Sequence, residues 1–284
     1  MPKSEELKVQ LNKAAKAFDD TNVYHEIQTK YTVESAELLL QQTGILSADN
    51  KILSKDDQPV TIVELGAGTG LFTTSALAAL EGKGKVRYVA TDPLECMEKA
   101  CAKYLPDVEF ALCKAENMPF PDSSVDAILG AGCFHWFANQ DAYQEMYRIL
   151  KPNGTLGYIT NLPSETESPQ WVLDTYKILY ESYNKTKAPF EHDFKWRKAL
   201  LNSNLFENFQ ENLKLRNFQA MNFNQCVQFF ASFGGVASAS EDHRSSFQTK
   251  LVNILDKHFK NKGEKLKGIE HIVEIYTAKS VKTK

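Results

Sequence analysis

A glycine-rich turn between two acids is the part of the sequence best suited to chemistry. Residues 63–70 are Val-Glu-Leu-Gly-Ala-Gly-Thr-Gly, with Glu64 just before the first glycine and Asp92 further along. Glycines at such a turn let the backbone approach a ligand, because no Cβ stands in the way. A helix beginning after the turn offers free N–H groups to an anion, and an acid after the next strand can accept both hydroxyls of a ribose. The combination predicts a site for a ligand that contains a nucleoside.

A parallel sheet is expected to position these residues. Short β-branched apolar runs occur at 60–65, 86–91, 108–113, 125–130 and 155–160, with helical segments between most of them. Strands that alternate with helices are typical of βαβ units, and ligands lie outside the carboxyl ends of such strands where the strand order reverses. Two later runs, 209–221 and 269–278, can each supply a further strand. The predicted fold class is therefore α/β, with a doubly wound, Rossmann-like and mostly parallel seven-stranded sheet.

The spacing of the glycines distinguishes two nucleoside cofactors. A dinucleotide fingerprint places its third glycine where this sequence has Leu71, whereas the third glycine here falls one place early, at Gly70. A G-x-G-x-G turn with an acid two residues before its first glycine resembles the class I S-adenosylmethionine-dependent methyltransferases. The resemblance implies S-adenosyl-L-methionine as the cofactor.

Later segments extend the resemblance over roughly residues 60–160. Residues 115–126 are similar to the family's segment between its third and fourth strands, and 148–154 to its R-x-L-K-P-G-G turn, with Asn153 replacing one glycine. Residues 130–137 include the His-Trp pair of a small-molecule subgroup, the trans-aconitate methyltransferase-like (type 11) enzymes. The Gly-Ala-Gly-Cys run at 130–133 argues against the methylators of nucleic-acid adenine and of glutamine amides.

The resemblance implies a set of cofactor-binding residues. Glu64 would lie near the methionine amino group, the backbone of 66–70 under the methionyl part, and Asp92 on the ribose. Met97 and Glu116 could equally be packing or helix-surface residues. The full expected set is Glu64, Gly66, Ala67, Gly68, Gly70, Asp92, Pro93, Met97, Ala115, Glu116, Gly130 and Ala131.

Two residues after the fourth strand are the catalytic candidates. His135 is expected either to act as a general base, which its chemistry allows near neutral pH, or to hold the loop through the backbone. Trp136 would form either a wall of the pocket or a core anchor. Tyr24, Tyr31 and Trp171 are further pocket candidates, and the alternative for Trp171 is core packing, which is the usual role of an aromatic run. No cluster with metal-ligand spacing is found, so no metal is expected, and Cys113 and Cys133 are expected to be small buried side chains.

Four segments of the chain are expected to have separate roles. Residues 1–58, including a helix over 5–18, would form an N-terminal helical lid, and residues 59–162 the cofactor-binding Rossmann-like core. Residues 163–205 would be a helical cap insertion, and residues 206–284 would complete the sheet. The lid follows from the resemblance, although Lys30-Tyr31-Thr32 departs from the family's Arg-Pro-containing pattern.

The composition is consistent with a cytoplasmic globular enzyme. The 284 residues carry 33 Lys and Arg against 36 Asp and Glu, a net charge of −3 that gives no reason to expect a nucleic-acid partner. No apolar run or leader-like segment predicts a membrane span or a secretory signal, and five cysteines without a C-x-x-C pair fit a reducing compartment. A monomer is expected.

The expected function is methyl transfer from S-adenosylmethionine to a nucleophilic O, N or S of a small molecule by in-line displacement, with a carboxylate favoured as acceptor. Two alternatives stay open: a non-catalytic regulatory protein that binds the cofactor, and a methyltransferase of a protein or RNA.

Overall fold

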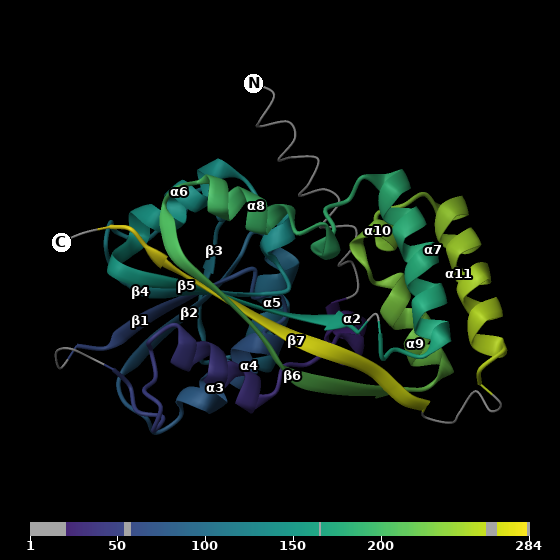
Figure 1. Cartoon of the computed structure of the whole chain (residues 1–284), viewed down its shortest axis with the longest axis horizontal. Coiled ribbons are helices and arrows are strands. Elements are labelled where there is room, and N and C mark those ends of the chain that lie inside the picture. Colours follow the sequence, from purple (N-terminus) through teal and green to yellow (C-terminus); the bar gives the residue numbers. More distant parts are fainter. Residues whose placement is uncertain (1–20, 54–57, 165, 260–265, 283–284) are drawn as a thin grey trace. The chain divides into compact units, whose positions relative to one another are not determined.

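The computed structural model describes residues 21–53, 58–164, 166–259 and 266–282 (Figure 1). The chain divides into two compact units, and each gathers separate segments. Unit 1 consists of residues 1–29, 162–190 and 216–272, and unit 2 of residues 30–161, 191–215 and 273–284. The helix expected over residues 5–18 lies outside the described residues.

Seven strands of the described residues form one sheet in the order β3-β2-β1-β4-β5-β7-β6. They are β1 Val60–Leu65, β2 Val86–Asp92, β3 Glu109–Leu112, β4 Val125–Ala131, β5 Leu150–Pro163, β6 Phe206–Met221 and β7 Leu266–Ser280. The pairs β1–β2, β1–β4, β2–β3 and β4–β5 are parallel, whereas Figure 1 shows β7 running opposite to β5. The predicted doubly wound, mostly parallel sheet is confirmed. Its switch point lies between β1 and β4, because β2 and β3 extend one side of β1 and β4 begins the other.

Helices connect and flank these strands in the described residues. They are α2 Thr21–Ile27, α3 Val33–Gln42, α4 Leu71–Leu80, α5 Glu95–Tyr104, α6 Gln140–Ile149, α7 Gln170–Thr186, α8 Lys195–Asn202, α9 Phe223–Ala231, α10 Gly234–Ala237 and α11 Glu241–Asp256. Two short 3-10 turns, η1 Phe134–Trp136 and η2 Glu191–Asp193, belong to unit 2.

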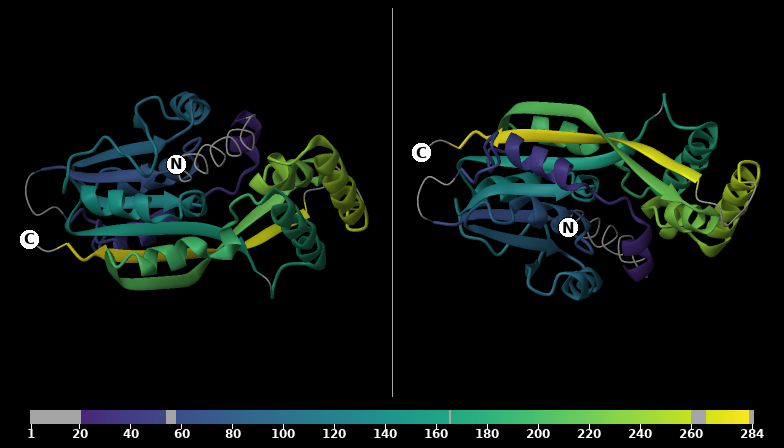
Figure 2. Two further views of the ribbon diagram at one scale, coloured as in Figure 1. Left: turned by 90° about the horizontal axis from the view of Figure 1, so that it is seen from above. Right: turned by 90° about the horizontal axis from the view of Figure 1, so that it is seen from below.

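Unit 2 has a core on both faces of the sheet. Successive side chains of a strand point to opposite faces, so Ile62 packs in the cluster that contains α3 and α4, while Val63 packs in the cluster that contains α6 and α8. Figure 2 shows these helix pairs on opposite sides of the sheet. Glu64 therefore shares the face of Ile62 and lies beside α4.

Unit 1 has an aromatic core of its own. Trp171 and Tyr176 of α7 pack edge-on against Phe230 of α9, at ring-centroid distances of 6.5 and 5.8 Å. Residues of α11 such as Leu251 are fully buried in the same cluster. The side-chain amide of Gln219 donates to the Ile27 carbonyl at 2.6 Å, which fixes the end of α2 within this unit.

Two expectations differ from the observed boundaries. The fifth strand begins at Leu150 rather than at 155, because Leu150 pairs with Val125 and an irregularity of register then absorbs the Lys-Pro-Asn-Gly sequence. The segment 163–205, expected as one helical cap, is divided: residues up to 190 belong to unit 1, and residues 191–205 belong to unit 2. The remaining strands of unit 2 lie close to their predicted positions.

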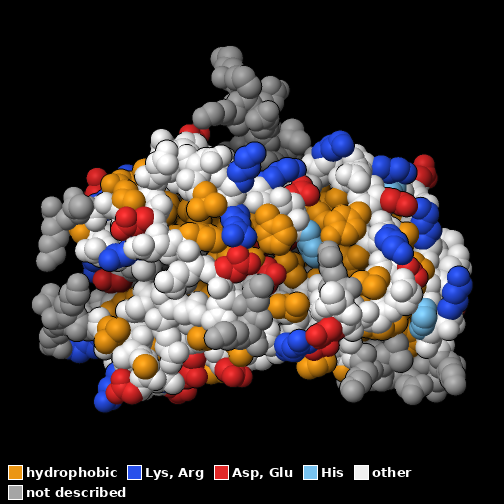
Figure 3. Space-filling model, viewed as in Figure 1, with side chains coloured by type: hydrophobic (Ala, Val, Ile, Leu, Met, Phe, Trp, Pro, Cys, Tyr) orange, Lys and Arg blue, Asp and Glu red, His pale blue; other side chains and the backbone are white. Residues whose placement is uncertain are grey.

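The surface mixes both signs of charge. Lys and Arg side chains are interspersed with Asp and Glu over the face shown in Figure 3. Among the described residues, helices are either too short or too polar to cross a membrane.

Candidate active site

Two glycines of the turn after β1 lie in different surroundings, one closely packed and the other not. Gly66 and Gly68 both have left-handed backbones, with φ of +60° and +57°. A Cβ added to Gly66 would lie 2.8 Å from Cβ of Cys133, so no larger residue fits there. Within the described residues, a Cβ on Gly68 would meet a single atom, the sulfur of Met97, at an ordinary contact distance of 3.9 Å. Gly68 therefore borders space that no other described residue fills.

Glu64 is buried, and the two oxygens of its carboxylate differ in their hydrogen bonding. Its Oε2 accepts hydrogen bonds from the hydroxyls of Thr73 at 2.6 Å and Tyr88 at 2.7 Å. Its Oε1 is buried and has no hydrogen-bond partner among the described residues. Burial raises the pKa of Glu64 to about 7, against the lowering effect of the two hydroxyls and with a small raising effect from Asp92. The ionised form of such a carboxylate is stabilised when a cationic or N–H group binds to it.

Asp92 lies at the end of β2 and is held by backbone donors. Its Oδ1 accepts from the N–H of Leu94 at 3.0 Å, and its Oδ2 accepts from the N–H of Gly68 at 3.2 Å. Burial raises the pKa of Asp92 to about 6, while these two bonds lower it. Each oxygen keeps a second lone pair, so the carboxylate can still accept two hydroxyl groups.

The other expected cofactor residues occupy the same carboxyl edge of unit 2. Pro93 is exposed and Met97, on α5, is buried, as is Ala115 after β3. Glu116 is partly buried and accepts from the Nδ2 amide of Asn139 at 2.8 Å, so it holds the start of α6. Ala67 is buried and donates its N–H to the Thr91 carbonyl at 2.9 Å. Gly70 caps the start of α4 in the left-handed conformation.

The loop after β4 packs against the glycine turn. A Cβ on Gly130 would lie 2.4 Å from the Phe134 ring, and Ala131 is partly buried at the end of the strand. The buried thiol of Cys133 donates to the Leu65 carbonyl at 3.1 Å, which ties this loop to the end of β1. A Cβ on Gly132 would meet the Tyr31 hydroxyl at 3.2 Å. The carboxyl ends of β1 and β4 therefore form one continuous edge, with Tyr31 beside it.

His135 has a partner that sequence reasoning missed. Its Nδ1 is hydrogen-bonded to Oε2 of Glu191, which lies on η2. The two side chains are only 14% and 11% exposed. Glu191 is far from His135 along the chain and in a segment without periodicity, so only its acidic type beside His192 and Asp193 could have drawn attention to it.

The remaining candidates lie in different surroundings. Trp136 is partly buried, with its ring 5.5 Å from that of His135. Tyr24 belongs to unit 1, where it is partly buried on α2. Trp171 also belongs to unit 1, is 4% exposed, and packs edge-on against Phe230 and Phe259. The pocket role of these residues stays a prediction.

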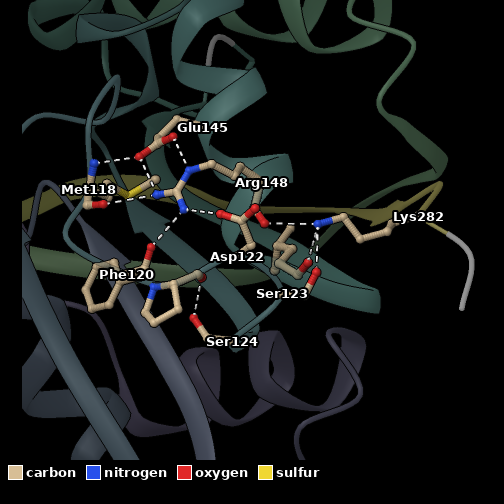
Figure 4. Close-up of polar contacts among 10 residues, drawn as sticks. Met118, Phe120, Asp122, Ser123, Ser124, Glu145, Arg148 and Lys282 are labelled. Atoms are coloured by element: carbon tan, nitrogen blue, oxygen red, sulfur yellow. Dashed lines mark hydrogen bonds and ion pairs between the residues drawn. The ribbon is translucent and has the colours of Figure 1, made fainter.

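An arginine on α6 fixes the segment that follows Ala115 and Glu116 (Figure 4). Arg148 donates to the carbonyls of Met118 at 3.1 Å and Phe120 at 2.9 Å, and to the carboxylates of Glu145 at 2.7 Å and Asp122 at 2.6 Å. To its right in Figure 4, Lys282 donates to the Arg148 carbonyl at 3.0 Å and to Ser123 Oγ at 3.1 Å. This network positions the loop around Met118 and Phe120. The hydrogen bonds of the Arg148 guanidinium go to groups of the protein itself.

No group of three or more His, Cys, Asp or Glu residues within the described ranges could hold a metal ion. The acids at the carboxyl edge are thus spread over separate positions, and each is held by its own donors.

Comparisons with known proteins agree with this architecture. A family described as a methyltransferase domain matches residues 62–154. An uncharacterized methyltransferase-like protein of Schizosaccharomyces pombe is 40% identical over 140 residues, which are 49% of this chain and 52% of that protein. An uncharacterized methyltransferase of Mycobacterium tuberculosis is 36% identical over 118 residues, 42% of this chain and 46% of that one. The chain thus spans about half the length of the curated relatives it matches.

A solved structure supports the fold over a longer stretch. The YcgJ protein from a Bacillus species superposes with a TM-score of 0.51 at 18% sequence identity, covering 88% of this chain and 99% of that one. At this identity the likeness concerns the fold alone. Residues 62–154 therefore match a methyltransferase domain, and the chain shares the fold of the YcgJ structure.

Proposed function

We propose that this protein transfers a methyl group from S-adenosylmethionine to a small molecule. The observation that carries the proposal is the buried Oε1 of Glu64, which has no hydrogen-bond partner among the described residues, on the strand that leads into the glycine turn. A buried carboxylate oxygen without a partner is costly, and the ammonium of a methionyl group would satisfy it. The open space at Gly68 supports the same ligand.

The chain's own residues would hold the cofactor along the carboxyl edge. Glu64 would accept the methionyl ammonium, Asp92 the ribose hydroxyls, and Gly66 and Gly68 would let the backbone approach the methionyl chain. Pro93 and Met97 would lie beside the adenine with Ala115 and Glu116 at its edge, and Gly130 and Ala131 would pass near the sulfonium, as in the family. The cofactor supplies an electrophilic methyl group on a sulfonium. The protein aligns the acceptor and excludes water.

The proposed acceptor is a nucleophilic O, N or S of a small molecule. A carboxylate, favoured by the resemblance to the trans-aconitate subgroup, is already charged and needs no base, whereas a hydroxyl or a neutral amine must lose a proton. Tyr31, His135 and Trp136 are the proposed pocket residues, and all three belong to unit 2. We further propose that the protein acts as a cytoplasmic monomer without metal.

Calorimetric titration with S-adenosylhomocysteine, with NAD as control ligand, tests the cofactor assignment. We expect micromolar binding of the first and none of the second. Gly68→Ala should abolish binding, since its methyl group fills the open space. Gly82→Ala is the matched control, because Gly82 is also left-handed, at φ +69°, and a Cβ there meets no described residue within 4 Å. Equal binding by both variants, or binding of NAD, would refute the assignment.

Transfer of a labelled methyl group separates the enzyme from the two alternatives. We expect label to enter the low-molecular-weight fraction of a deproteinised cell extract. Label found only in protein or RNA would favour a macromolecular substrate. Tight binding of S-adenosylhomocysteine without transfer to any fraction would favour a regulatory protein.

A further inference from the structure

The His135–Glu191 pair is a fixed acid–base arrangement inside unit 2. His135 lies on η1 directly after β4, and Glu191 begins η2. Both side chains are largely withdrawn from water. A hydrogen bond of this kind, between two side chains held by short 3-10 turns, orients the imidazole ring.

The pairing determines which nitrogen carries the proton. A carboxylate can only accept hydrogen bonds, so the Nδ1 of His135 donates to Glu191 and the Nε2 keeps its lone pair. The second oxygen of Glu191 is buried without a hydrogen-bond partner in the described part of the chain, so its negative charge is available to stabilise a protonated ring. The pair therefore has the form of a neutral imidazole base backed by a carboxylate.

Four ionisable groups around the pair have pKa values that burial shifts away from neutral pH. Burial raises the pKa values of the Cys133 thiol and of the Tyr143 and Tyr158 phenols, and it lowers that of His192 to about 4, so these four groups are uncharged. Burial also raises the pKa of Glu274, and the Glu191 charge adds to this. The groups that face Glu191 are Cys133 after β4, Tyr143 on α6, Tyr158 on β5, His192 on η2 and Glu274 on β7.

The pair also bears on the acceptor. An acceptor that is already anionic needs no base, whereas a hydroxyl must lose a proton and would meet the imidazole of His135.

We propose that His135, positioned by Glu191, removes the proton of a hydroxyl acceptor, so that the methyl acceptor is an alcohol or phenol in place of the carboxylate that the resemblance favours. This inference rests on the proposed function. The acceptor oxygen forms the new bond to the methyl carbon, the carbon–sulfur bond breaks with its electron pair remaining on sulfur, and the hydroxyl proton goes to Nε2 of His135. Glu191 stays ionised and stabilises the imidazolium that results.

Nitrogen NMR of the imidazole rings tests the positioning without any turnover. The chain has six histidines, and loss of one signal in His135→Ala assigns the ring. We expect the Nδ1–H form in the wild type and in Glu191→Gln, whose amide oxygen still accepts, and loss of that preference in Glu191→Ala. Asp193→Asn is the matched control on the same turn, since Asp193 pairs with Lys195 at 2.6 Å. An Nε2–H ring in the wild type, or no change in Glu191→Ala, would overturn the positioning role.

The chemistry of the labelled product tests the acceptor class. An ether formed from a hydroxyl is neutral and stable to mild alkali, whereas a methyl ester releases volatile methanol and a methylated amine binds a cation exchanger. We expect a neutral, alkali-stable product. Its rate of formation should fall by about 10²-fold or more in His135→Ala. It should also fall at least about tenfold in Glu191→Ala, fall less in Glu191→Gln, and stay unchanged in Asp193→Asn.

Each other outcome has a distinct meaning. Alkali-labile or cationic product overturns the hydroxyl assignment while leaving the methyltransferase intact. Absence of any product from wild-type protein that binds S-adenosylhomocysteine counts against the proposed function itself. If Glu191→Ala does not fold, a wild-type rate in Glu191→Gln overturns the need for the charge.

Discussion

Two acidic regions of unit 2 differ in the groups that hydrogen-bond to their carboxylates. Glu64 and Asp92, on β1 and β2, receive hydrogen bonds from hydroxyls and backbone N–H groups, which are uncharged. Glu191, by contrast, is bonded to the imidazole of His135. Burial raises the pKa values of Glu64 and Asp92 to about 7 and 6, because no cation among the described residues offsets it.

The difference separates a binding role from a proton-transfer role. A buried carboxylate without a cationic partner is poised for a ligand that brings the positive charge. A carboxylate already bonded to a histidine is poised to tune that histidine. The cofactor side of the site, Glu64 and Asp92, and the acceptor side, His135 and Glu191, can therefore be tested independently.

Glu64→Gln should have the largest effect on binding. The variant keeps the shape and can still accept from Thr73 and Tyr88, but it offers no charge to an ammonium group. We expect the affinity for S-adenosylhomocysteine at pH 8 to fall by about 3 kcal/mol, on the order of a hundredfold. Calorimetry would measure this, and a change below threefold would contradict the role of Glu64.

The same substitution should change how stability depends on pH. Because the pKa of Glu64 rises from its ordinary 4.5 to about 7 on folding, the folded chain keeps a proton there that the unfolded chain loses. The resulting stability is complete below pH 4.5 and is lost as the pH rises through 7. Relative to Glu64→Gln, the ligand-free wild type should lose about 2 kcal/mol between pH 5 and pH 8. Urea unfolding of both proteins measures this difference, and parallel pH curves would disprove it.

Asp92→Asn should have a smaller effect than Glu64→Gln. One oxygen remains to accept a ribose hydroxyl, but the amide cannot accept through its nitrogen. We expect a loss of affinity for S-adenosylhomocysteine of about 1 kcal/mol, near fivefold, with a smaller loss for methionine-containing fragments that lack the ribose. Equal losses of affinity for both ligands would show that Asp92 does not bind the ribose hydroxyls.

Arg148→Lys should affect stability and spare binding. Lysine cannot reproduce the planar set of contacts to Glu145, Asp122 and the two loop carbonyls (Figure 4). Because the side chain is 34% exposed, we expect a loss of only about 1 kcal/mol in unfolding free energy. Affinity for S-adenosylhomocysteine should change less than twofold, and a larger change would assign the network to the cofactor site.

Local patterns predicted the strands and the glycine turn of unit 2, and long-range contacts account for what they missed. The run at 60–65 is a strand because its β-branched residues are buried on both faces, and the glycines after it mark a turn that only glycine can make. Glu191 escaped prediction because its role depends on a contact with His135, far away in the chain. The start of β5 was missed because pairing with Val125 overrides the turn residues at 151–154. Likewise, no local pattern shows that unit 1 gathers three separate segments.

The affinity for S-adenosylhomocysteine at pH 6 and pH 8 tests the central claim most directly. Glu64 must be ionised to hold the ammonium group, and its pKa of about 7 lies between these two conditions. We predict binding about tenfold tighter at pH 8, with release of a proton on binding at pH 6. In Glu64→Gln the difference should shrink to about twofold, the part that Asp92 contributes through its pKa of about 6. Equal affinity at the two pH values, or no binding at either, would contradict it.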